Sequence, residues 1–129
     1  MIAYPTIDTG GVASPGLWVD RAAVQRNIDQ MIEDVGGTEQ IDRLRPHMKT
    51  HKMGEVISMQ VASGIVKCKA ATPMEVLVAA RNGISDVLLA QQPVGEKIEW
   101  LGELIETFPG TRFGTIVDHI EGLEAISRV

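Results

Sequence analysis

The residues best suited to chemistry lie together in one short stretch, residues 44–52, which reads Leu-Arg-Pro-His-Met-Lys-Thr-His-Lys and is called the basic segment below. It holds five basic or imidazole side chains and no acidic residue. Its apolar and polar residues alternate with the period of a β-strand, which places Arg45, His47 and Lys49 on one face. A solvated run of charges is the plainest interpretation, but crowded titratable side chains are more typical of a functional site. We therefore predict a cationic strand that carries a reactive lysine at its carboxyl end.

A lysine in such surroundings can act as a nucleophile. An ordinary lysine, with a pKa of about 10.4, is almost wholly protonated near neutral pH and is therefore unreactive. Neighbouring cations and partial burial both favour the neutral amine. A neutral amine can form a Schiff base with a carbonyl, including the aldehyde of pyridoxal phosphate. We predict this role for Lys49, which shares the predicted strand face with Arg45 and His47. We expect Lys52, beyond the predicted strand end, to reach solvent or a phosphate group.

The order of these residues resembles a known signature. Residues 45–52 are similar to the R-P-H-x-K-T-H-K motif of the D-threonine aldolase and D-serine dehydratase family, whose members are pyridoxal-phosphate enzymes with the barrel of the alanine racemases. In that family the first lysine of K-T-H-K carries the Schiff base, a role that the resemblance assigns to Lys49. The similarity covers most of residues 15–120, with further matches in residues 15–20, 26–28 and 86–95.

The resemblance also implies which other residues take part. The side chains expected to contact the cofactor together with Lys49 are His47, Thr50, His51 and Gln92. The amide of Gln92 is suited to a cofactor ring or substrate, although an ordinary loop amide is an equally good interpretation. The family's metal site, a histidine followed by an aspartate or cysteine near the carboxyl terminus, has no counterpart in this sequence. A divalent metal is therefore expected for the full-length family, with no ligands from this chain.

The activity that the resemblance implies is that of a pyridoxal-phosphate-dependent lyase. Its substrates would be small D-3-hydroxy amino acids, cleaved by a retro-aldol reaction, and this chain would be the amino-terminal part that holds the Schiff-base lysine. Dehydration of D-serine or racemisation of an amino acid on the same scaffold is the runner-up. A non-catalytic pyridoxal-phosphate-binding protein and an inactive fragment are alternatives from other classes. The sequence does not choose among the reactions.

The elements that must position these residues follow an alternating pattern. Apolar runs predict strands, and apolar residues spaced by three and four predict helices between them. Such alternation is typical of a parallel sheet with right-handed crossovers. The fold class expected is α/β, specifically about four βα units of a (β/α)8 TIM-type barrel, which needs eight units and about 250 residues when complete. The predicted strands are 17–19, 44–52, 65–70, 87–90 and 113–117, and the predicted helices follow Asp20 and occupy 54–63, 72–83, 98–105 and 120–129.

The domain organisation expected is an irregular arm over residues 1–16 and the amino-terminal half of an alanine racemase-like barrel over residues 17–129. Barrel enzymes place their sites at the carboxyl ends of the strands. That rule brings residues 49–51 together with Lys69, Gln91, Gln92, Asp118 and His119. The alternation along residues 67–69 turns Cys68 the other way, so we expect it to be packed in the core.

Composition limits the partners. The chain has 129 residues, 12 basic against 17 acidic, and a net charge of −5, which argues against nucleic acid and anionic membrane partners. One cysteine and the lack of a long apolar run favour a cytoplasmic protein. Half a barrel would leave an open sheet edge, so we expect a second copy of the chain, or the remainder of the barrel, to cover it.

Overall fold

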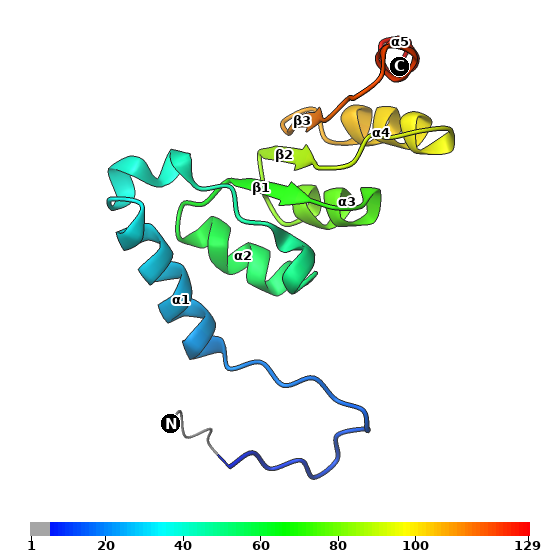
Figure 1. Cartoon of the computed structure of the whole chain (residues 1–129). Helices are drawn as coiled ribbons and strands as arrows, with labels where there is room; N and C mark the ends of the chain where they lie inside the picture. Colours follow the sequence, from blue (N-terminus) through cyan, green and yellow to red (C-terminus); the bar gives the residue numbers. More distant parts are fainter. Residues whose placement is uncertain (1–5) are drawn as a thin grey trace.

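The computed structural model describes residues 6–129, so the first five residues of the predicted arm lie outside the described residues. Residues 6–20 form an extended arm without helix or strand, and the alternating part of the chain begins after it (Figure 1). The helices are α1 (Arg21–Asp34), α2 (Gly54–Ala62), α3 (Pro73–Arg81), α4 (Glu96–Thr107) and α5 (Ile120–Ile126), with 3₁₀ turns η1 (Thr38–Arg43) and η2 (Met48–Thr50). The strands are β1 (Lys67–Ala70), β2 (Asp86–Leu89) and β3 (Arg112–Thr115).

The three strands form one sheet in the order β1-β2-β3, and every pairing is parallel. Lys67 pairs with Asp86, and Asp86 pairs with Arg112, so the strands start and end level with one another. A helix connects each strand to the next, as parallel pairing requires. The predicted α/β class with a parallel sheet is confirmed.

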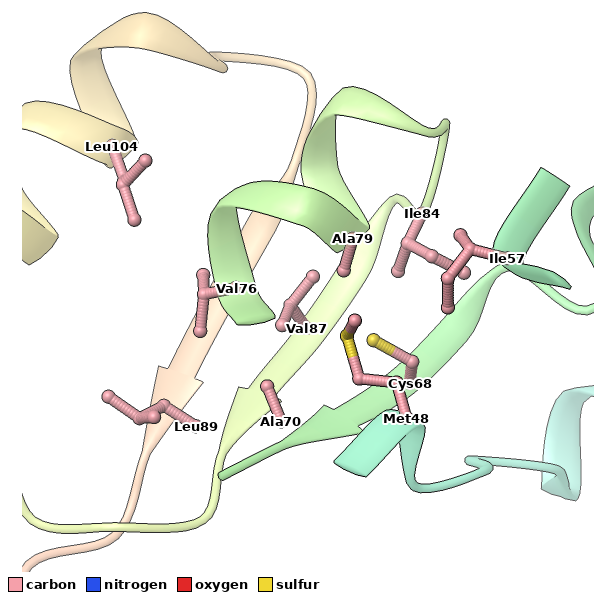
Figure 2. Packing of buried hydrophobic residues seen from close by; sticks show 10 residues of the cluster. All are labelled: Met48, Ile57, Cys68, Ala70, Val76, Ala79, Ile84, Val87, Leu89 and Leu104. Atoms are coloured by element: carbon pink, nitrogen blue, oxygen red, sulfur yellow. The ribbon is translucent and has the colours of Figure 1, made fainter. Parts of the chain in front are cut away.

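The core lies between the sheet and the helices α2, α3 and α4. Figure 2 shows that Cys68, Ala70, Val87 and Leu89 of β1 and β2 point toward Val76 and the other buried side chains of this layer. Every second residue of β1 and β2 is buried, which is the period expected of a sheet covered on one face, whereas β3 has no fully buried residue. The prediction that Cys68 is packed is confirmed, because the residue is fully buried and burial raises the pKa of its thiol to about 12.

Helix boundaries follow the signals in the sequence. The carboxylate of Asp20 accepts a hydrogen bond from the backbone N–H of Ala23 and caps α1. Gly36 and Gly37 end the same region with φ of 108° and 87°, values that suit glycine. The hydroxyl of Thr72 accepts from the N–H of Glu75 and caps α3, with Pro73 in the first turn. None of the helices in the described part of the chain has the length and apolar composition that crossing a membrane requires.

Two predicted strands are wrong. Residues 17–19 lie in the arm without a pairing partner, and Leu17 is 81% exposed. The basic segment makes a single parallel bridge, between His47 and Lys69, and then turns into η2. Pro46 has no N–H to donate to a ladder. Further along, the N–H of Lys49 bonds to the His47 ring, and those of the two residues after Thr50 bond to the Met48 carbonyl.

Candidate active site

The basic segment runs parallel to the carboxyl-terminal half of β1. A backbone hydrogen bond and the buried side chain of Met48 hold it against that strand. The N–H of Lys69 donates to the carbonyl of Pro46 at 2.9 Å. Met48 is 1% exposed and joins the core beside Cys68 (Figure 2). Because the pairing is parallel, the residues after His47 project past the carboxyl end of β1. Lys49 and Thr50 are exposed there, so the expected partial burial of Lys49 is wrong.

The two histidines of the segment are held in one orientation by backbone hydrogen bonds. The Nδ1 atom of His47 accepts from the N–H of Lys49 at 3.3 Å, and Nδ1 of His51 accepts from the N–H of Met53 at 3.1 Å. In the neutral rings these bonds assign the proton to Nε2. Burial lowers the pKa of His47, and the charges of Lys49 and Lys69 lower it further. Burial also lowers the pKa of His51.

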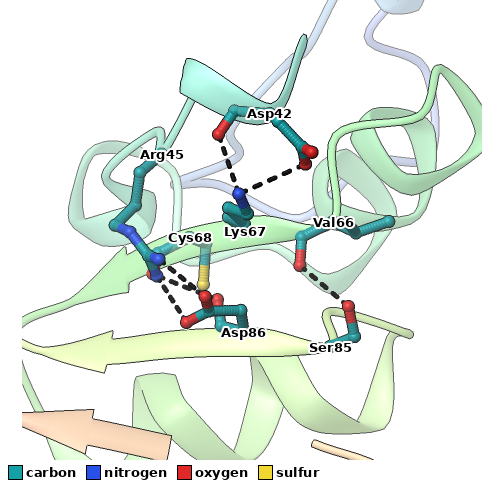
Figure 3. Close-up of polar contacts among 7 residues, drawn as sticks. All are labelled: Asp42, Arg45, Val66, Lys67, Cys68, Ser85 and Asp86. Atoms are coloured by element: carbon teal, nitrogen blue, oxygen red, sulfur yellow. Dashed lines mark hydrogen bonds and ion pairs between the residues drawn. The ribbon is translucent and has the colours of Figure 1, made fainter. Parts of the chain in front are cut away.

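Arg45 does not stand beside Lys49 as the strand pattern predicts. Its guanidinium makes two parallel contacts of 2.8 Å with the carboxylate of Asp86, and it also donates to the Cys68 carbonyl at 3.3 Å (Figure 3). Asp86 is the first residue of β2, so the pair joins the basic segment to the amino-terminal end of the sheet. Hydrogen bonding to Arg45 holds the pKa of Asp86 below its usual range. Arg45 therefore fixes the path of the segment and takes no direct part at the lysine.

Lys52 reaches a carboxylate instead of open solvent or a phosphate. Its Nζ lies 3.2 Å from Oε1 of Glu75, in the first turn of α3, whose Oε2 accepts from the N–H of Ala71 at 2.7 Å. The Glu75 side chain is 4% exposed and that of Lys52 is 64% exposed. Burial alone would raise the pKa of Glu75, but the Ala71 N–H and Lys52 outweigh it, and the pKa is lowered. Lys52 has a φ of 54°, which is rare outside glycine and costs backbone strain.

The remaining predicted residues form a second group. Oε1 of Gln92 accepts from the N–H of Asp118 at 2.9 Å, which ties the turn after β2 to the turn after β3. Thr115 donates its hydroxyl to the Gln91 carbonyl at 3.0 Å in the same region. His119 precedes α5 and lies 3.8 Å from Glu121. The structure thus brings His47, Lys49, Thr50, His51 and Lys69 together at the end of β1. It shows no hydrogen bond or ion pair between described residues that joins Gln92 to them.

Two contacts of this site are not predicted from the sequence. One joins Asp86 to Arg45, and the other joins Glu75 to Lys52. The pattern Thr72-Pro73-Met74-Glu75 predicts that Glu75 turns back toward the start of its helix, and its carboxylate does reach the N–H just before the Thr72 cap. Nothing in the spacing indicates a lysine as the second partner. In the sequence, Asp86 can be recognised only as a polar residue just before an apolar run.

The donors around Lys49 fit one end of pyridoxal phosphate. An exposed primary amine suits the aldehyde, and the Nε2–H groups of two neutral imidazoles are suitable donors for the oxygen atoms of a ring. The Thr50 hydroxyl donates to the His47 carbonyl at 3.4 Å, so its oxygen is left to accept a hydrogen bond. Within residues 6–129 no group of three or more histidine, cysteine or carboxylate side chains is placed to hold a metal ion. A hollow of about 640 Å³ lies between α1 and α2. Of its lining residues, Met53 is the one next to the basic segment.

The fold and the loop together define a parallel α/β protein with a lysine–histidine cluster at the carboxyl end of a strand. Among solved structures, the chain is similar to the crystal structure of D-threonine aldolase from Filomicrobium marinum, with 32% sequence identity and a TM-score of 0.76. The match covers 91% of this chain and 31% of that chain, so this chain spans about a third of the length of the aldolase. Neither a family model nor a curated protein matches. The relationship indicated by the sequence is confirmed: the chain is D-threonine aldolase-like.

Proposed function

We propose that this chain carries the cofactor-attachment site of a pyridoxal-phosphate-dependent lyase that cleaves small D-3-hydroxy amino acids, with Lys49 as the lysine that bonds to the cofactor. The observation that carries the proposal is the position of Lys49. It is exposed past the end of β1, between two oriented imidazoles, within the eight residues that resemble the family's motif. The similarity to a D-threonine aldolase over 91% of the chain supports the same conclusion.

The proposed fold of the complete protein is a (β/α)8 barrel, of which β1, β2 and β3 with their helices form part. The carboxyl ends of parallel barrel strands surround the active site. The position of Lys49 at such an end supports this placement, as does the position of Gln92 after β2. Gln92 would contact the cofactor or substrate through its amide nitrogen, because its oxygen is taken by the Asp118 N–H.

The residues of this chain would bind and orient the reacting groups. Lys49 would hold the cofactor through its amine, with His47, Thr50 and His51 beside it. Bound pyridoxal phosphate supplies an electron sink for the charge that develops on the substrate. His47 and His51, neutral because burial lowers their pKa, can donate from Nε2 without adding positive charge beside the amine. Thr50 adds a hydroxyl next to the lysine.

The reaction is tested by the products. Incubated with pyridoxal phosphate and D-threonine, a protein that contains this chain should release glycine and acetaldehyde in equal amounts, and L-threonine should not react. Lys49→Ala should abolish the release, whereas Lys52→Ala should retain part of it. Pyruvate and ammonia from D-serine would identify the dehydratase, and inversion of the α-carbon would identify a racemase. Bound cofactor without turnover would contradict the lyase and favour a pyridoxal-phosphate-binding protein.

We also propose that the β3 edge is covered in the complete protein by further strands of the barrel or by a second copy. Among the described residues β3 pairs with β2 alone, and after it Ile116, Ile120 and Leu123 are between 49% and 64% exposed. An unpaired strand edge beside apolar side chains tends to associate. Sedimentation of the 129-residue chain should therefore show association at micromolar concentration. A single monomeric species would contradict the proposal.

A further inference from the structure

The basic segment holds two lysines, either of which could react with a carbonyl. Lys49 and Lys52 are three residues apart, and both side chains reach the surface. Only a neutral amine attacks an aldehyde, since a protonated or ion-paired ammonium has no lone pair to offer. A site that uses one of the two must therefore treat them differently. The structure contains one residue that does so.

That residue is Glu75, which lies outside the basic segment, in the first turn of α3. Its Oε2 is fixed by the Ala71 N–H at 2.7 Å, and its Oε1 lies 3.2 Å from Nζ of Lys52. Within the described residues Oε1 has no hydrogen-bond partner, so the ammonium of Lys52 is the group that compensates its charge. A carboxylate in the first turn of a helix is also stabilised by the helix dipole. The buried carboxylate of Glu75 is therefore fixed in position and charged, and its Oε1 atom is the one that contacts the cation.

The backbone strain lies at Lys52 and not at Lys49. Lys52 adopts a left-handed φ of 54°, a conformation that costs free energy in residues other than glycine and persists only where other contacts compensate it. Lys49, three residues earlier, has no carboxylate within salt-bridge distance among the described residues. The titratable groups near Glu75 include His47 and His51, and the charge of Glu75 partly opposes the lowering of their pKa values.

We infer that Glu75 is a positioning residue that determines which lysine reacts: it holds the side chain of Lys52 in an ion pair and leaves the side chain of Lys49 outside that pair, available to a carbonyl. The inference rests on the function proposed for Lys49 and goes beyond it, because it assigns the choice between the two lysines to a residue outside the motif.

The test uses the 129-residue chain without cofactor. Trace acetylation with an N-hydroxysuccinimide ester, read by peptide mass spectrometry, gives the relative reactivity of each lysine, with the exposed Lys97 of α4 as internal reference. Glu75→Gln keeps an oxygen for the Ala71 N–H and removes only the charge. It should raise the reactivity of Lys52 about two- to fivefold, which corresponds to about 0.4–1 kcal/mol, the range of an exposed ion pair. The reactivity of Lys49 should stay unchanged.

The matched control is Asp42→Asn, which removes the partner of Lys67 at 3.2 Å and should leave the Lys52-to-Lys49 ratio unchanged. Should Glu75→Gln not fold, the wild-type chain decides: raising sodium chloride from 0.05 to 1 M, as an experimental range, screens the pair and should raise the reactivity of Lys52 relative to Lys97. A Lys52 reactivity that does not change, or a rise shared equally by Lys49, overturns the inference. Since no cofactor is present, that result would leave the attachment of pyridoxal phosphate to Lys49 to be judged separately.

Discussion

The basic segment and the strand β1 beside it have similar alternating patterns but different structures. Along β1, Lys67 and Lys69 alternate with the buried Cys68 and Ala70, and each residue pairs with one of β2. In the basic segment only His47 pairs, and the chain then coils into η2. The difference lies in the backbone donors. β1 has an N–H at every position. In the basic segment Pro46 has none, and the ring of His47 accepts the N–H of Lys49.

The comparison shows how one chain builds a rigid support and an exposed site from adjacent residues. The ladder of β1 holds its side chains in fixed alternation. The basic segment is held at three side chains, Arg45, Met48 and Lys52, while Lys49 between them stays exposed. A fully paired strand would have continued the ladder past His47.

The largest effect is expected for Met48→Ala. The side chain is 1% exposed and packs in the core, so its removal should lower the free energy of unfolding by about 2–5 kcal/mol, the range for large-to-small core substitutions. Met74→Ala is the matched control, because Met74 is 60% exposed, and it should change stability by less than about 0.5 kcal/mol. Urea unfolding midpoints measure both. Equal losses in the two variants would contradict the description of Met48 as an anchor.

An intermediate effect is expected for Asp86→Asn. It leaves the guanidinium of Arg45, whose side chain is 31% exposed, without its charged partner, and should cost about 1–3 kcal/mol. Asp42→Asn, whose aspartate is 80% exposed in its pair with Lys67, should cost at most about 1 kcal/mol. A double-mutant cycle with Arg45→Met separates the pair energy from other losses. A coupling energy no greater than that of the Asp42 pair would show that Arg45 does not hold the segment.

The smallest effect is expected in the pH dependence. Burial lowers the folded-state pKa of His47 and His51, so below about 6.5 the unfolded chain binds more protons than the folded chain. Their contribution to stability is therefore complete above about pH 6.5 and is lost as the pH falls through the lowered values. The double variant His47→Gln, His51→Asn should flatten this part of the stability curve. A decline between pH 7 and 5 that is as steep as in the wild-type chain would refute the assignment.

Much of the fold could be predicted from the sequence because its signals are local. The caps at Asp20 and Thr72, the glycines after α1 and the apolar runs of β1 and β2 all act within a few residues. The parallel order follows from alternation of strand and helix. The motif in residues 45–52 led to the D-threonine aldolase relationship, which the structural similarity confirms.

The form of the site could not be predicted in the same way, because it depends on partners far along the chain. Arg45 meets Asp86 across 41 residues, and no pattern within the basic segment indicates that its charge is already paired. The ion pair of Lys52 with Glu75 is likewise non-local and requires a positive φ that the sequence does not suggest for lysine. The alternation of apolar and polar residues in the basic segment predicted a strand that does not form. A period of two also occurs in loops that bury one side chain, as this segment buries Met48.

Lys49 is the lysine proposed to bond to pyridoxal phosphate, and reductive labelling tests this assignment most directly. The 129-residue chain is incubated with excess pyridoxal phosphate, reduced with borohydride, digested and mapped by mass spectrometry. The label should concentrate on Lys49, at a level well above that of the exposed Lys97, and Lys49→Ala should remove it. Label found mainly on Lys52, Lys67 or Lys69, or spread evenly over all exposed lysines, would contradict the account.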